Sequence, residues 1–178
     1  MNIVVLMGSP NKNGSTAILV REFMRGAQQA GHTVTVVDAV HLDIHPCTGC
    51  VACGYGSSPC AQKDDMERVR PLILGTDMLV FATPLYYFGF SAQLKAVIDR
   101  FCAFNGELNA GHKKSALLSV AWNGATETFS ALEAHYKTLV GYLNLQDCGA
   151  IFGLGCGSPA MTERTKYPRL AYELGKGV

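Results

Sequence analysis

The chain has 178 residues, and its formal net charge is only +1. Charged residues make up 16% of it, against roughly 25% in an average domain, and hydrophobic residues make up 48%. This composition excludes an intrinsically disordered chain. A nearly neutral chain without long basic or acidic runs also disfavours a nucleic-acid-binding protein and a carrier with a strongly acidic surface. The low charge predicts that a partner subunit or a ligand covers some apolar surface.

No segment of the sequence predicts a membrane span or a secretion signal. The longest apolar runs, residues 3–7 and 78–82, fall far short of the roughly 20 residues that a spanning helix needs. The first ten residues lack the basic start and the small-residue cleavage site of a signal peptide. We therefore expect a cytoplasmic protein with neither a membrane nor a nucleic acid as its partner.

Apolar runs alternate along the chain with segments of helical periodicity. Strands are predicted at residues 2–7, 33–38, 77–83, 115–122 and 147–152. Helices are predicted at residues 15–30, from Asp64 up to a kink or early end at Pro71, and at 90–101, 127–142 and 161–175. This alternation predicts a single α/β domain over residues 1–178, with a parallel sheet that helices cover on both faces. A polar, Cys- and Gly-rich insertion at about 41–62 interrupts the pattern.

Ligands of open parallel sheets bind beyond the carboxyl ends of the strands. The loop after the first strand, residues 8–16, carries hydroxyls and glycines at the start of a helix. Free backbone N–H groups and the helix dipole at such a place favour a phosphate. No Lys follows Gly14, so the loop does not have the P-loop pattern of nucleotide triphosphatases. The alternative is an ordinary strand-to-helix turn that a hydroxyl caps.

The loop after the third strand contains three consecutive aromatic residues, Tyr86, Tyr87 and Phe88. Neither a strand nor a helix buries three neighbouring side chains, so at least one ring must point away from the core. We expect these rings to bind a flat heterocycle, with a hydrophobic cap or a subunit contact as the alternative. Trp122 follows the fourth strand and either borders the same ring or lies in the core. The glycine cluster at 153–157 is interpreted as a loop before the last helix.

Two motifs carry a resemblance to a known family. The segments GSPxxxGST and TPLYYxGxSAxLKxxIDR, together with the five strand–helix units, resemble the flavodoxin-like NAD(P)H-dependent FMN reductases. The resemblance covers nearly the whole chain. It implies a flavodoxin-like sheet in the order 2-1-3-4-5, bound FMN, NAD(P)H as co-substrate, and a homodimer or homotetramer.

The resemblance also implies which residues hold the FMN. The phosphate loop corresponds to Ser9, Asn11, Gly14, Ser15 and Thr16; the isoalloxazine loop to Pro84, Leu85, Tyr86, Tyr87, Phe88 and Gly89; the third loop to Trp122, Asn123 and Gly124. Asn11 departs from the family pattern, because many members have Arg or Lys there. This departure removes a positive charge from the phosphate site, unless Lys12 replaces it.

Four of the seven cysteines lie close together in the insertion, at Cys47, Cys50, Cys53 and Cys60. Their spacing allows four interpretations: a [4Fe–4S] cluster, a zinc site, redox-active or disulfide-paired thiols, or small packing residues without a metal. The spacing resembles the motif of iron–sulfur flavoproteins, a branch of the same family. Other members that share the surrounding pattern, from Pro46 to Met66, keep these cysteines without a demonstrated cluster. Cys102, Cys148 and Cys156 are expected to be buried packing residues.

These observations predict an FMN-dependent NAD(P)H oxidoreductase whose acceptor is a quinone, another flavin or a similar small molecule. The alternative is an iron–sulfur flavoprotein that carries electrons through a cluster on the four cysteines. No side chain is expected to be catalytic, because the flavin performs the hydride chemistry. Asp99 and Arg100 are expected to hold a neighbouring loop or a subunit contact. A phosphoacceptor receiver domain is disfavoured, because it needs acidic residues where this chain has Met7, Gly8 and Ser9.

Overall fold

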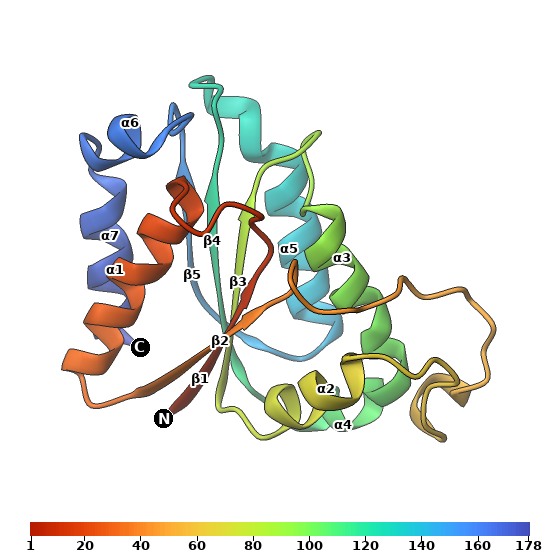
Figure 1. Cartoon of the computed structure of the whole chain (residues 1–178). Coiled ribbons are helices and arrows are strands. Elements are labelled where there is room, and N and C mark those ends of the chain that lie inside the picture. Colours follow the sequence, from red (N-terminus) through yellow and green to blue (C-terminus); the bar gives the residue numbers. More distant parts are fainter.

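The computed structural model describes all residues from 1 to 178. Its centre is one parallel sheet of five strands in the order β2-β1-β3-β4-β5 (Figure 1). The strands are β1 (Asn2–Met7), β2 (Thr33–Asp38), β3 (Met78–Pro84), β4 (Lys114–Val120) and β5 (Gln146–Gly153). The predicted α/β fold and the strand order that the family resemblance implied are therefore confirmed.

Helices cover both faces of the sheet and close two hydrophobic cores (Figure 1). On one face lie α1 (Ser15–Gln29) and α7 (Tyr167–Gly177); on the other lie α2 (Met66–Leu74), α3 (Ala92–Asp99) and α5 (Ser130–Tyr142). Neighbouring residues of the central strand β3 enter opposite cores, as Val80 and Phe81 do. This burial on both sides explains why β1, β3 and β4 are almost continuously apolar in sequence.

Several predicted helices differ from those of the structure at their ends. The predicted helix at 90–101 is α3 followed by a 3₁₀ segment, η2 (Arg100–Phe104), and by α4 (Asn105–Ala110). The predicted helix at 127–142 begins with another 3₁₀ turn, η3 (Thr126–Phe129). The last predicted helix is two helices, α6 (Pro159–Glu163) and α7, and Pro168 lies in the first turn of α7. Proline lacks the N–H that a continuing helix needs, and this explains the break. In contrast, α2 continues through Pro71 to Leu74.

Helices α1 and α7 touch each other through their backbones at two glycines. A Cβ atom built on Gly26 would lie 2.1 Å from the carbonyl oxygen of Tyr172, and one on Gly175 would lie 2.1 Å from the carbonyl oxygen of Phe23. Any side chain at either position would collide with rigid backbone. The two glycines therefore set the separation between α1 and α7.

The Cys-rich segment extends from the sheet on the side of α3 and α4 (Figure 1). Its one regular element is a short 3₁₀ turn, η1 (Gly54–Gly56), which packs against η2 and α4. No helix anywhere in the chain combines the length and the apolar character that crossing a bilayer requires.

Candidate functional site

A pocket of about 370 Å³ lies at the carboxyl edge of the sheet, where the loops after β1, β3, β4 and β5 meet. Its volume lies within the range of about 300–1,000 Å³ that small-ligand sites occupy. The predicted residues that line it are Ser9, Asn11, Gly14, Ser15, Thr16, Pro84, Leu85, Tyr86 and Trp122. The structure thus brings residues of all three predicted loops into one cavity.

The loop after β1 presents an open helix N-terminus to this pocket. Gly14 is the N-cap of α1, no side chain caps the helix, and no acidic residue lies in its first turn. Ser15 and Thr16 are the first two residues of the helix, and neither side chain caps it, so the alternative of a hydroxyl-capped turn does not apply. The uncapped N–H groups leave positive potential for an anion. Lys12 lines a different groove, between α1 and β2, and does not replace the charge that Asn11 lacks.

The aromatic loop after β3 is a tight turn that exposes all three rings. The backbone N–H of Gly89 donates to the carbonyl oxygen of Tyr86 at 3.1 Å. Tyr87 and Phe88, the two central residues of the turn, have φ angles of 45° and 65°. This left-handed geometry normally selects Asn or Gly, so two aromatic residues here store strain, about 1–3 kcal/mol each. Strain of this kind is characteristic of functional loops, and here it holds the aromatic rings outside the core.

Trp122 lies outside the core, contrary to one of the two sequence interpretations, and 75% of it is exposed. β4 ends at Val120, two residues earlier than predicted, so Trp122 belongs to the loop. Its ring lies against the backbone of Gly157, where a Cβ atom would come within 2.4 Å of the indole. Gly157 and its neighbour Cys156 also line the pocket.

Sequence reasoning missed this fourth wall. The glycine cluster at 153–157 does form the loop before α6, as predicted, and it also reaches the pocket. The loop after β5 could have been assigned to the pocket only from its position, because the carboxyl end of β5 lies beside that of β4.

A second, shallower hollow of about 300 Å³ adjoins the pocket and shares Leu85, Ala121 and Trp122 with it. Three predicted residues of the site, Tyr87, Phe88 and Asn123, line this hollow and not the pocket itself. Gly89 and Gly124 line neither of the two cavities. The predicted site is therefore divided between two neighbouring cavities.

Comparison with known proteins shows the family of this chain. The family described as NADPH-dependent FMN reductase matches residues 1–156. The chain belongs to this family. An iron-sulfur flavoprotein of Archaeoglobus fulgidus is 28% identical over 144 residues, which cover 81% of this chain and 61% of that relative. The chain thus spans less than two thirds of the length of this relative.

Two solved structures share this fold. An NAD(P)H:quinone oxidoreductase from Methanothermobacter marburgensis superimposes with a TM-score of 0.77 at 17% identity, over 99% of this chain and 95% of the other. An azoreductase from Bacillus anthracis gives a TM-score of 0.75 at 16% identity over the full length of both chains. At such low identity these likenesses show the fold alone.

The donor set of the pocket fits FMN, the cofactor in the family's description. The uncapped start of α1 and the hydroxyls of Ser15 and Thr16 would hold the phosphate. Tyr86 and Trp122 would border the isoalloxazine ring. No Asp, Glu, His, Lys or Arg lines the pocket, so neutral donors would bind the phosphate.

The four clustered cysteines do not form a metal centre in this structure. Cys47 and Cys50 are exposed, Cys53 and Cys60 are half-buried, and no three His, Cys, Asp or Glu side chains are placed to hold a metal ion. Hydrogen bonds from the backbone of Ala52 and from Thr48 lower the pKa of the exposed Cys50 thiol. The residues present therefore do not fit a [4Fe–4S] cluster or a zinc ion as they are arranged here.

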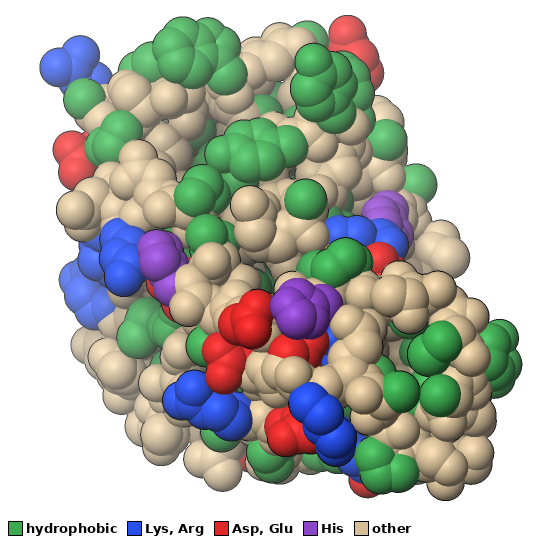
Figure 2. All heavy atoms as spheres, turned by 45° about the vertical axis from the view of Figure 1, so that its right-hand side comes forward, with side chains coloured by type: hydrophobic (Ala, Val, Ile, Leu, Met, Phe, Trp, Pro, Cys, Tyr) green, Lys and Arg blue, Asp and Glu red, His purple; other side chains and the backbone are tan.

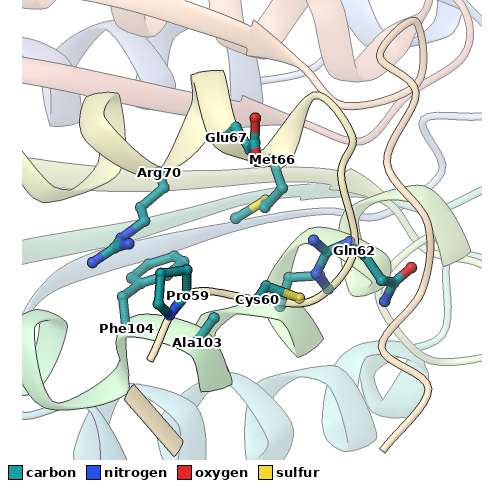
Figure 3. Close-up of a pocket in the computed structure, with 9 residues that line it drawn as sticks. Pro59, Cys60, Gln62, Met66, Glu67, Arg70, Ala103 and Phe104 are labelled. Carbon is teal, nitrogen blue, oxygen red and sulfur yellow. The ribbon is translucent and has the colours of Figure 1, made fainter. Parts of the chain in front are cut away.

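Cys60 lies instead in a small pocket of about 160 Å³ between α2 and η2 (Figure 3). Figure 3 shows Met66 and Arg70 reaching toward this pocket from α2, and Ala103 and Phe104 lining it from η2. Among the remaining cysteines, Cys156 is buried as predicted, whereas Cys102 and Cys148 are only half-buried.

A buried ion pair fastens both ends of the Cys-rich segment. The guanidinium of Arg100 donates to both carboxylate oxygens of Asp64 and to the backbone carbonyl of His45, the latter at 2.9 Å. The side chains of Arg100 and Asp64 are 2% and 0% exposed. Asp64 also accepts the backbone N–H groups of His45 and Met66. Of the two roles expected for Arg100, the structure shows the holding of a neighbouring loop.

This pair has a consequence for stability in acid. Burial by itself raises the pKa of the Asp64 carboxyl, but the hydrogen bonds from Arg100, His45 and Met66 together hold that pKa below its ordinary value. A carboxyl of lowered pKa stabilises the fold above the pKa of the unfolded chain, about 3.9, and this stabilisation is lost as the pH falls through the lower pKa of the folded state.

We predict that Asp64→Asn lowers the free energy of unfolding at neutral pH by about 3–5 kcal/mol, because Arg100 remains buried without its partner. The difference in the free energy of unfolding between the variant and the wild type should narrow in acid, because protonation of Asp64 breaks the ion pair in the wild type. Urea unfolding followed by circular dichroism across the pH range measures both effects. Glu67→Gln, at an exposed ion pair with Lys63, is the matched control and should change the free energy by less than about 1 kcal/mol. A pH-independent difference for Asp64→Asn would contradict the assignment.

We also predict that Gly157→Ala displaces Trp122. Trp122 is the only tryptophan, so the emission maximum of the protein reports its environment directly. The emission should shift in the variant, and FMN should bind about two- to tenfold more weakly, as expected for the loss of one aromatic contact. The control is Gly124→Ala in the same loop as Trp122, because nothing lies within 4 Å of the added methyl group. Unchanged emission in Gly157→Ala would show that the indole does not rest on this glycine.

Proposed function

We propose that the chain is an FMN-dependent NAD(P)H oxidoreductase that passes electrons from the nicotinamide to a small acceptor such as a quinone or a second flavin. The observation that carries this proposal is the single pocket in which an uncapped helix N-terminus faces exposed aromatic residues. An uncapped helix start and aromatic rings that line one pocket suit a monophosphorylated aromatic cofactor. The family match over residues 1–156 supports the same cofactor.

Bound FMN would supply the redox chemistry, a two-electron transfer from NAD(P)H to the acceptor. With a quinone the balance is one NAD(P)H, one proton and one quinone giving NAD(P)⁺ and one hydroquinone. The chain's own residues bind and orient the cofactor. Because no acidic or basic side chain lines the pocket, solvent would supply the proton.

The exposed aromatic residues also support the proposal that the protein works as a homodimer or a homotetramer. Phe88 is 57% exposed and Tyr87 is fully exposed, beside Trp122 at the same edge. Figure 2 shows hydrophobic side chains gathered over the upper part of one face, whereas most of the charged side chains lie lower. Apolar groups concentrated in this way favour a covering surface, which a second copy of the chain would supply.

The phosphate loop is tested by comparing two flavins. We predict that the purified protein is yellow or takes up FMN, and that Ser15→Ala binds FMN about tenfold more weakly, because a hydrogen bond to a charged group is lost. Riboflavin lacks the phosphate, so its affinity should be equal in the two proteins. Equilibrium titration followed by flavin fluorescence measures the dissociation constants of both flavins for both proteins. A colourless protein that binds no FMN would overturn the proposal. If Ser15→Ala weakened the binding of both flavins equally, the loop after β1 would not be the phosphate site.

A second candidate function is an iron–sulfur flavoprotein that carries electrons through a cluster as well as FMN. It is favoured by the spacing of Cys47, Cys50, Cys53 and Cys60, and by relatives that bear this name, one of them 30% identical over 100 residues. The present arrangement of these cysteines speaks against it. Iron and acid-labile sulfide are therefore measured after anaerobic purification and reconstitution. We expect FMN without stoichiometric iron; equal and stoichiometric amounts of both elements would establish the second function instead.

A further inference from the structure

The small pocket between α2 and η2 contains a cysteine beside a buried cation. Cys60 is half-buried, and it lines this pocket of about 160 Å³ together with Arg100 (Figure 3). The cavity is smaller than the roughly 300 Å³ at which sites for drug-sized ligands begin. It therefore suits a molecule of only a few atoms.

The guanidinium of Arg100 has one donor that the ion pair does not use. Its two terminal nitrogens donate to Asp64 and to the carbonyl oxygen of His45, whereas its Nε–H has no hydrogen-bond partner. The side chain is only 2% exposed, and buried polar atoms without a partner are rare in native proteins. A ligand from solvent would not reach an atom buried in this way, but a group formed on a neighbouring side chain would.

The neighbouring side chain that can carry such a group is Cys60. Burial by itself lowers the pKa of Arg100, whereas Asp64 and then Cys60 raise it, and the net shift is upward. The pKa of Lys63 is also raised, mainly by its hydrogen bond to Glu67 and in small part by Cys60. The Cys60 thiol thus lies near two cations, and a partly exposed, electropositive environment is typical of reactive cysteines.

We propose that Cys60 is a site of oxidation by hydrogen peroxide, and that the free Nε–H of Arg100 binds the sulfenyl oxygen formed there. The sulfur displaces hydroxide from the peroxide, so the O–O bond breaks and an S–O bond forms. The hydroxide takes the thiol proton and leaves as water, and sulfur loses the two electrons that the peroxide gains. The new oxygen supplies the acceptor that Arg100 lacks, and it ties residue 60 to the ion pair that fastens the Cys-rich segment.

The experiment compares hydrogen peroxide with cumene hydroperoxide, a bulky oxidant of the same chemical class. The purified protein is treated with each oxidant without NAD(P)H and is then separated from it by rapid gel filtration. One aliquot is unfolded in iodoacetamide to count free thiols and another in dimedone to count sulfenic acids, both by mass spectrometry. Cys50 is exposed and serves as the internal reference. We expect Cys60 to prefer hydrogen peroxide over cumene hydroperoxide more strongly than Cys50 does.

The donor is tested by Arg100→Lys, because lysine keeps the charge but has no Nε–H. Oxidation of Cys60 should slow about tenfold, the effect of one hydrogen bond to a charged group, and oxidation of Cys50 should not change. Arg70→Lys is the matched control, since Arg70 lines the same pocket but pairs with Glu107. This variant should leave the rate at Cys60 unchanged.

The wild type provides a second measurement if Arg100→Lys does not fold. The Nε–H of Arg100 is buried, so its ¹⁵N NMR resonance can be followed during oxidation. We expect this resonance to shift as Cys60 is oxidised, and to stay in place when Cys60→Ser receives the same treatment.

The possible failures are distinguishable. An unmoved Arg100 resonance, equal selectivity of Cys60 and Cys50 for the two oxidants, or a Cys60 thiol that survives while Cys50 is consumed would overturn this inference. Stoichiometric iron and sulfide after reconstitution would also overturn it, because a cluster would occupy the Cys60 sulfur. A protein that holds no FMN would overturn the proposed function and leave this inference standing.

Discussion

The parallel pairing of β1, β3 and β4 is the constraint on which the rest of the molecule depends. Because these strands run in one direction, their carboxyl ends and the loops that follow them lie at a single edge. The apolar side chains that fill both cores hold this register, since a slip of one residue would exchange the two faces. The loop after β1 and the aromatic turn, about 70 residues apart in sequence, thus become two walls of one cavity.

Features that depend on local pattern were predictable from the sequence. The buried strands are marked by continuous apolar runs, and the helix start that faces the pocket is marked by hydroxyls and glycines. Features that depend on distant contacts were not. The exposure of Trp122 depends on where β4 stops pairing, and the role of Gly157 on which ring lies against it. The spacing of the cysteines likewise indicates possible metal ligands, but it does not show whether their side chains come close enough to bind one metal ion.

Arg100 illustrates the same limit in another way. In sequence it is one cation near the end of an amphipathic helix, and we expect it to hold either a neighbouring loop or a subunit contact without being able to name its partner. Its partner Asp64 is 36 residues away, and only the packing of α2 against η2 brings the two together. The pair closes the Cys-rich segment at its base, so that segment can vary in conformation without disturbing the sheet. The structure therefore separates the site that would bind flavin from the cysteines that first suggested a second redox centre.

The close backbone contacts at Gly26 and Gly175 give the last helix an indirect influence on ligand binding. Helix α1 presents its N-terminus to the pocket, and α7 touches it through bare backbone near its other end. A rigid helix transmits displacement along its length, so a shift of α7 would tilt α1 and move the amides that face an anion. Residues 167–177 lie outside the part of the chain that matches the family, 1–156. They nevertheless fix the position of α1 by packing against its backbone.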